Sequence, residues 1–276
     1  MALATRMVPI ADGSDMGGSL RNPAAFNNVI GFRPSFGRVP GLNNELFLGQ
    51  LSVDGPMGRS VADVEKLLSF QAGYDPRHPL SLAAEDMAFN PKTDLRGLRV
   101  GWLGDYGGYL PFQPGVLDLC RASLDIFSAL GAHVELAEPH FDMDRLWQGW
   151  RTLRHFLVAN GHAADYADPA KRAEMKPELL WEIENGKGLT ASEVYAASVI
   201  RSDWYRTMLA LFERFDVLVL PSAQVFPFDA ELHWPKEIAG RAMDTYHRWM
   251  EVVVGPTMAS LPVAAMPAGF GADGLP

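Results

Sequence analysis

Near its N-terminus the chain carries the stretch GSDMGGSLRNPAA (residues 13–25), in which a serine follows two glycines and precedes a segment typical of a helix start. Gly17 and Gly18 can adopt backbone angles that side chains forbid, so several N–H groups can converge on one point. We expect Ser19 just before a short helix with Pro23 in its first turn. Donors at such a position suit a developing oxyanion. The stretch therefore predicts a serine exposed beside backbone donors, with an ordinary N-capping serine as the alternative.

This stretch and the one after it, VIGFRPSFGRVP (residues 29–40), resemble the amidase signature family of serine hydrolases. Further blocks match that family in order: DGPMGRSVAD (54–63), DVLVLPS (216–222), and LPVAAMPAGF (261–270) with GLP (274–276). The resemblance extends from Arg6 to Pro276 and is sparse between Glu138 and Arg214. It implies an α/β fold in which helices cover a large mixed β-sheet.

The resemblance also assigns roles to the residues around the two glycines. It implies that Ser19 is the nucleophile that forms an acyl-enzyme. It implies an oxyanion hole built from the backbone N–H groups of Met16, Gly17, Gly18 and Ser19. Asp15 and Arg21 match a supporting pair, whose salt bridge or shared hydrogen bonds would hold the turn rigid. The alternative for that pair is a solvated surface contact worth about 0–1 kcal/mol.

The family's general base does not occur at the expected place in this sequence. In the family a lysine acts through a second serine, held in a cis peptide, and both lie upstream of the nucleophile. Residues 1–12 contain neither lysine nor serine, and the first lysine is Lys66. The sequence therefore resembles an internal piece of an amidase, trimmed at both ends. We expect little turnover from this chain alone, because a serine hydroxyl is a weak nucleophile until a neighbour takes its proton.

The composition is that of a globular protein with a sizeable core. The chain has 276 residues, 48% of them hydrophobic and 21% charged, which suits one large domain or two small ones. The resemblance implies a single amidase-signature domain over residues 1–276. A net charge of −9 and the absence of a basic run argue against nucleic-acid binding. There is no apolar run long enough to cross a membrane and no signal peptide, so the cytoplasm is the default location.

Few other residues suggest a cofactor or a partner. Cys120 is the only cysteine, so no internal disulfide is possible, and a buried structural thiol is expected. No metal or organic cofactor is implied, and the expected partner is a small-molecule amide substrate. A homo-oligomer is the other expected assembly, because sheet edges left without upstream strands would favour self-association.

Hydrophobic periodicity and turn residues predict the order of the elements. A β-α-β unit with a parallel strand pair is expected from Leu98 to Leu136. Further elements are an irregular strand at Arg6–Ala11 with a turn at Asp12–Asp15, a helix from Ser60 to Gly73, a turn-rich connection at Asp75–Arg96, helices from Asp142 to Phe215, a strand at Asp216–Leu220, an interrupted helical stretch at Ala239–Met258 and a strand at Val263–Met266.

Three other groups of residues are weaker candidates than the serine. His155 and His162 can share a helix face, but no zinc signature completes them. The glycines after the strand at 98–103 do not have dinucleotide-binding spacing, so a flexible loop is favoured. Trp147, Trp150 and Trp249 are candidates for a substrate pocket, although buried aromatic residues on helices usually belong to the core.

The function implied by the resemblance is hydrolysis of a carboxylic amide to an acid and ammonia or an amine, through an acyl-enzyme at Ser19. Within the family the alternative is the glutaminase-like component of a tRNA-dependent amidotransferase. From a different class, the alternative is a non-catalytic fragment or pseudoenzyme that acts by association.

Overall fold

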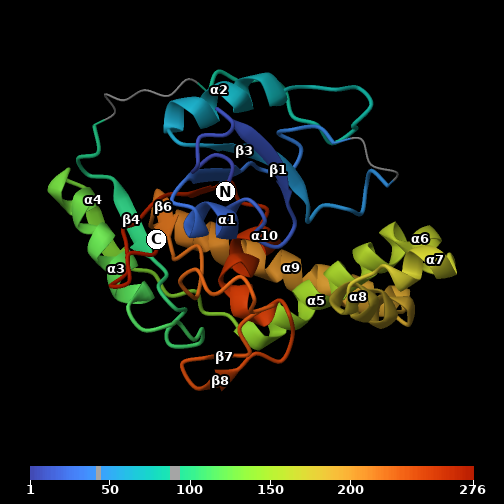
Figure 1. Cartoon of the computed structure of the whole chain (residues 1–276). Coiled ribbons are helices and arrows are strands. Elements are labelled where there is room, and N and C mark those ends of the chain that lie inside the picture. Colours follow the sequence, from blue (N-terminus) through green and yellow to red (C-terminus); the bar gives the residue numbers. More distant parts are fainter. Residues whose placement is uncertain (42–44, 88–93) are drawn as a thin grey trace. The chain divides into compact units, whose positions relative to one another are not determined.

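The computed structural model describes residues 1–41, 45–87 and 94–276. The chain divides into two compact units: unit 1 comprises Met1–Pro139 and Leu209–Pro276, and unit 2 comprises His140–Met208. Among the described residues all strands belong to unit 1, and unit 2 is helical (Figure 1). The predicted α/β class is therefore confirmed, whereas the single-domain organisation stays a prediction. Residues 88–93 of the expected turn-rich connection lie outside the described residues.

The larger sheet of unit 1 is antiparallel, with the strand order β1-β3-β2-β9. Its strands are β1 (Ala11–Asp15), β2 (Ile30–Arg33), β3 (Val53–Gly58) and β9 (Val263–Ala265). Figure 1 shows β1 and β3 side by side, with the short helix α1 (Arg21–Phe26) near them. The strand predicted at Val263–Met266 is confirmed as β9. This sheet carries the serine stretch, which directly follows β1.

The N-terminal strand lies later in the chain than predicted. The expectation of a strand at Arg6–Ala11 and a turn at Asp12–Asp15 is wrong, because β1 occupies Ala11–Asp15. The residues before it form turns instead, with the Arg6 amide donating to the Leu3 carbonyl at 3.1 Å. The turn-forming residues of β1 stay extended because pairing with β3 satisfies their backbone groups. Asp15 therefore stands at the end of a strand, in register with Val53.

The smaller sheet of unit 1 is parallel and has the order β5-β4-β6. Its strands, β4 (Arg99–Trp102), β5 (His133–Leu136) and β6 (Val217–Val219), confirm the predicted β-α-β unit and the strand expected at Asp216–Leu220.

The helices of unit 1 differ slightly from the prediction. The single helix expected in the crossover of the β-α-β unit is divided into α3 (Val116–Ser123) and α4 (Asp125–Ala129). The Ser123 hydroxyl donates to the Cys120 carbonyl at 2.6 Å, a side-chain bond that commonly bends helices. α2 (Val61–Gln71) begins as predicted, with the Ser60 hydroxyl accepting from the Asp63 amide at 3.1 Å.

The region predicted as an interrupted helix, Ala239–Met258, begins differently. It contains a short hairpin of β7 (Glu237–Ile238) and β8 (Arg241–Ala242), then the 3₁₀ helix η1 (Arg248–Val253) and α10 (Val254–Met258). Gly255 and Pro256 lie inside α10 and do not interrupt it, because Pro256 is in the first turn, where its missing N–H is not needed.

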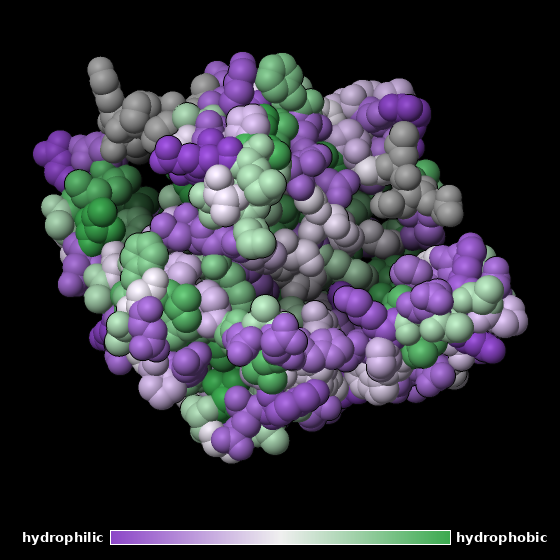
Figure 2. Space-filling view, in the orientation of Figure 1, coloured by the Kyte–Doolittle hydropathy of each residue, from purple (hydrophilic) through white to green (hydrophobic). Residues whose placement is uncertain are grey.

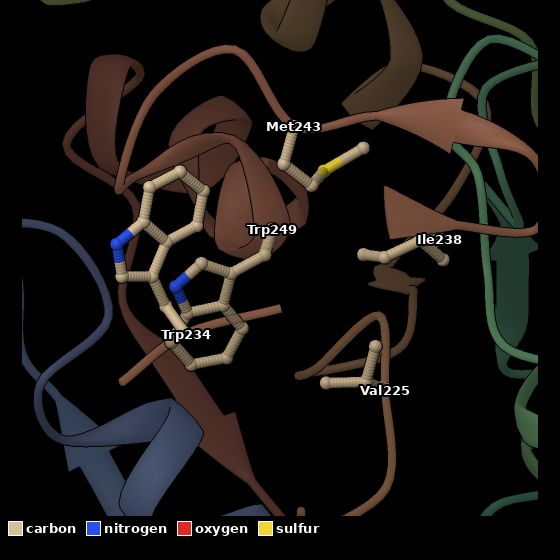
Figure 3. Close-up of a cluster of buried hydrophobic side chains, with 5 residues drawn as sticks. All are labelled: Val225, Trp234, Ile238, Met243 and Trp249. Carbon is tan, nitrogen blue, oxygen red and sulfur yellow. The ribbon is translucent and has the colours of Figure 1, made fainter. Parts of the chain in front are cut away.

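A buried hydrophobic cluster joins the hairpin to η1 (Figure 3). Figure 3 shows its side chains gathered from the loop before the hairpin, the hairpin itself and η1: Val225, Trp234, Ile238, Met243 and Trp249. Phe26 of α1 packs against this cluster, with its ring 6.1 Å from that of Trp249. The cluster therefore fixes η1 and α1 to the same core.

Unit 2 confirms the helices predicted between Asp142 and Phe215. They are α5 (Met143–Gly161), α6 (Ala163–Ala167), α7 (Pro169–Ala173), α8 (Pro177–Lys187) and α9 (Ala191–Phe212), the last of which continues into unit 1. α5 and α8 approach closely at Gly186, where an added Cβ would lie 2.1 Å from the His155 carbonyl oxygen. The rings of Trp147 and Trp150 stack at 5.0 Å, and both side chains are buried.

Hydrophilic and hydrophobic residues are intermixed over the face of the molecule that Figure 2 presents. Among the described residues, none of the helices combines the length and the apolar character needed to cross a membrane.

A glycine-to-alanine substitution tests the close packing of α1 on β2. A Cβ added to Gly31 would lie 2.1 Å from the Leu20 carbonyl oxygen, a backbone atom that cannot move aside alone. We expect Gly31→Ala to lower the free energy of unfolding by about 1–3 kcal/mol, as overpacked sites do. Chemical denaturation measures the change.

Gly13→Ala is the matched control for that substitution. Gly13 lies in β1 of the same sheet, and the nearest atom to its added Cβ is the flexible Leu20 Cδ2 at 3.4 Å. Equal loss of stability in the two variants would contradict the packing argument.

Candidate active site

Ser19 lies on an exposed turn between β1 and α1. The turn is closed by the Gly18 carbonyl, which accepts from the amides of Arg21 at 2.9 Å and Asn22 at 2.8 Å. Among the described residues, the Ser19 side chain has no hydrogen-bond partner. The hydroxyl is therefore open to an incoming molecule, and no general base is hydrogen-bonded to it.

The carboxylate of Asp15 holds this turn from beneath. Asp15 is fully buried, and its two oxygens accept from the Gly18 amide at 2.8 Å and the Leu20 amide at 3.2 Å. Arg21 forms a bidentate salt bridge with Asp15, in which Nη2 donates to Oδ1 at 2.8 Å and Nε donates to Oδ2 at 2.9 Å. The pair is therefore a buried structural element and not a solvated surface contact.

Arg21 also ties the turn to the C-terminal part of unit 1. Its Nη1 donates to the Val253 carbonyl at 2.6 Å, and its Nη2 donates to the Thr257 hydroxyl at 2.6 Å. The Thr257 hydroxyl in turn donates to the Val253 carbonyl at 2.8 Å. Each of these groups is buried, so one guanidinium joins the serine turn to η1 and α10.

A second buried arginine, Arg33 at the end of β2, was not predicted. Its Nη1 donates to the backbone carbonyl of Asp15, and its Nη2 donates to the Leu51 carbonyl at 2.9 Å. Nη1 also lies 3.5 Å from the Asp15 carboxylate. The available signal was a charged residue directly after the apolar run of Val29–Phe32.

These contacts decide the protonation of Asp15. Burial raises its pKa, but the charges of Arg21 and Arg33 and the hydrogen bonds from Arg21 and the Gly18 amide together lower the pKa to about 2. The neighbouring phenol of Tyr106 has a pKa above its ordinary value, chiefly because the side chain is buried. At neutral pH the Asp15 carboxylate is therefore ionised and the Tyr106 phenol is neutral.

Gly18 is the position where the turn depends on a glycine. Its φ of +102° is a conformation that side chains rarely adopt. A Cβ added there would lie 2.2 Å from Asn22 Oδ1 and 2.8 Å from Val253 Cγ2. Asn22 is itself held in place, because its Nδ2 donates to the Ser222 carbonyl at 3.0 Å.

The expected oxyanion donors differ in availability. The Gly18 amide, one of four expected donors, is already donated to the Asp15 carboxylate. In the part of the chain that the structure describes, the amides of Met16, Gly17 and Ser19 have no hydrogen-bond partner. Since an N–H group has one hydrogen to donate, three of the four expected donors remain unpaired within the described part of the chain.

The other candidate groups lie elsewhere. No cluster of three or more His, Cys, Asp or Glu side chains suited to a metal occurs among the described residues. Burial, and then the charges of Arg151 and Arg154, lower the pKa of His155 to about 4. Trp249 lies in the buried cluster of Figure 3. Cys120 is half-buried, less than expected, and burial raises the pKa of its thiol to about 11.

The lowered pKa of Asp15 predicts a pH dependence of stability. A carboxyl whose pKa is about 2 when folded and about 4 when unfolded stabilises the fold above pH 4, and this contribution is lost as the pH falls towards 2. We expect Asp15→Asn to lower the free energy of unfolding at pH 5 by about 3 kcal/mol, because Arg21 loses its buried partner. Denaturant titrations of wild type and Asp15→Asn give the difference in their free energies of unfolding. This difference should be about 1 kcal/mol smaller at pH 3 than at pH 5.

Asp12→Asn is the control, since it removes an exposed carboxylate from the same strand. Its effect should stay within about 0.5 kcal/mol at both pH values. If the difference in free energy of unfolding between wild type and Asp15→Asn were the same at both pH values, the lowered pKa of Asp15 would be contradicted.

Comparison with known proteins identifies the family. The family model described as Amidase matches residues 1–276. The chain is 30% identical over 287 residues to an acylamidase from Rhodococcus erythropolis, with 100% of this chain and 57% of the relative covered. It is 31% identical over 307 residues to the A-type component of the glutamyl-tRNA(Gln) amidotransferase from Paraburkholderia xenovorans, with 98% and 60% covered. The chain thus spans under two thirds of the length of either relative.

Among solved structures, the chain resembles a bacterial aryl acylamidase of the amidase signature family, with a TM-score of 0.86 at 29% identity. The match covers 100% of this chain and 58% of that one. Because the family model matches along the whole sequence, the chain belongs to the amidase family.

Proposed function

We propose that the site hydrolyses a carboxylic amide through an acyl-enzyme on Ser19. The observation that carries the proposal is an exposed serine hydroxyl beside three backbone N–H groups that have no partner among the described residues. Family membership and the acylamidase relative support the reaction type. Ser19 Oγ attacks the carbonyl carbon, and the amides of Met16, Gly17 and Ser19 stabilise the oxyanion that forms.

The proton balance of this reaction requires a base. The Ser19 hydroxyl gives up its proton as the new C–O bond forms, and the leaving amine takes up a proton as the C–N bond breaks. Water then cleaves the acyl-enzyme to the carboxylic acid and restores the hydroxyl. Asp15 cannot serve as this base, because its oxygens are occupied by Gly18, Leu20 and Arg21 and its pKa is lowered to about 2. Its role in the proposal is to fix the turn.

The 276 residues lack a lysine near the serine in sequence, since the first one is Lys66 on α2. The Lys66 ammonium lies 4.8 Å from the ring of Phe70, over which it packs. We therefore infer that this polypeptide, assayed alone, turns over amides slowly. Its oxyanion donors alone provide a residual acceleration of about 10³–10⁴-fold over water.

The amidotransferase relative supports a second candidate, a glutaminase that works within a larger assembly. The two candidates differ in their amide substrate and in their need for a partner. Hydrolysis of glutamine that appears only when the other amidotransferase components are added would favour the second. Hydrolysis of an aryl or aliphatic amide without them would favour the first.

Covalent labelling tests the role of Ser19. We expect a fluorophosphonate probe to form an adduct at Ser19, slowly because no base is hydrogen-bonded to the hydroxyl, and Ser19→Ala to form none. Intact-mass and peptide mass spectrometry measure the adduct. Ser14→Ala is the matched control, because Ser14 is also exposed and lies on the adjoining strand β1.

The possible results separate the two parts of the proposal. The same adduct level in Ser19→Ala as in wild type, or no adduct in wild type, would refute the nucleophile. Hydrolysis of a small amide at ordinary enzyme rates, abolished in Ser19→Ala, would support the nucleophile and refute slow turnover.

A further inference from the structure

Unit 2 contains a pocket that the amidase chemistry does not use. It has a volume of about 290 Å³ and lies where α6, α7 and α8 meet the end of α5. Figure 1 shows α6, α7 and α8 grouped together in yellow. Part of its lining is apolar, formed by Ala159, Ala163, Ala167 and Ile183. A volume near 300 Å³ is at the small end of ligand pockets, so it suits a small organic molecule.

The rest of the lining is an aromatic ring with two cations. The Lys187 ammonium lies 4.7 Å from the ring centroid of Tyr166, and the Arg172 guanidinium carbon lies 5.3 Å from it. All three side chains line the pocket. Both cations therefore contact the same ring at the edge of the pocket. The Tyr166 hydroxyl donates to Glu184 Oε1 at 3.3 Å.

Neither cation has a carboxylate partner among the described residues. Arg172 and Lys187 form no ion pair within 4.0 Å there, whereas Lys171, next to Arg172 in sequence, pairs with Asp165 at 2.6 Å. Both cations lie in the last turns of their helices, where positive charge is favourable. The helix dipole explains why the residues at these positions are positively charged. It does not explain why both cations contact the same tyrosine ring at the pocket. Both side chains are exposed, so an anion that enters the pocket from solvent can reach both of them.

We propose that this pocket binds a small organic carboxylate with an apolar body. The carboxylate would accept hydrogen bonds from Arg172 and Lys187, and the apolar body would lie against the alanines, Ile183 and the Tyr166 ring. The apolar lining favours an organic anion over inorganic phosphate, because phosphate has no apolar surface to bury there. All the residues that carry the proposal belong to unit 2, so it does not depend on Ser19.

Benzoate is the probe, with benzamide as its neutral isostere and inorganic phosphate as an anion without an apolar body. Isothermal titration calorimetry on the whole chain measures the dissociation constants. We expect benzoate to bind saturably with one site per chain. The dissociation constants of benzamide and phosphate should be at least about tenfold higher. Equal binding of benzoate and benzamide, tighter binding of phosphate than of benzoate, or no binding of benzoate would each overturn the proposal.

Variants assign the binding to this pocket. Arg172→Gln and Lys187→Gln should each weaken benzoate binding about fivefold to tenfold, because each removes a charged donor. Lys171→Gln is the control: it removes the same charge from the same helix, but from a side chain engaged by Asp165. Its effect should stay within about twofold. Benzoate binding that is unaffected by Arg172→Gln and Lys187→Gln, or weakened equally by all three variants, would overturn the proposal. Circular dichroism checks that each variant is folded.

Discussion

The buried carboxylate of Asp15 is the group on which the serine turn depends. It accepts hydrogen bonds from two amides of the turn and from two nitrogens of Arg21, so the turn is closed around a negative charge. A charge removed from water is tolerated only when it is paired and hydrogen-bonded, and this one satisfies both conditions. The backbone path from Asp15 to Arg21 then follows from the positions of the oxygens, and Ser19 lies outside that ring of bonds.

The same arrangement divides the amides of the turn into two groups: those bonded to Asp15 and those without a partner among the described residues. The Gly18 and Leu20 amides point to the carboxylate, while the amides of Met16, Gly17 and Ser19 have no partner among the described residues. Because Gly18 has a φ of +102° and lies against Asn22 and Val253, the turn has little freedom to exchange these roles. In the proposed reaction this arrangement favours the oxyanion, because donors that are already oriented need no rearrangement as the charge develops.

The sequence was most informative where the local pattern decides the structure. The capped helix α2, the parallel pair of β4 and β5, and the helices of unit 2 follow from periodicity and caps, and the structure has them. β1 was misplaced because its residues favour a turn locally and become extended only by pairing with β3. Arg33 was missed for a related reason: its partners are carbonyl groups of other strands and loops, whose approach depends on the sheet's register.

The bonds from Arg21 to Val253 and Thr257 have a consequence for how the protein matures. They join residues separated by 232 and 236 positions along the chain. During synthesis, which proceeds from the N-terminus, the motif around Ser19 leaves the ribosome long before its partners exist. Until they arrive the Arg21 guanidinium lacks two of its acceptors, so the turn acquires its final rigidity only after residues 253–257 have been synthesised and have folded against it.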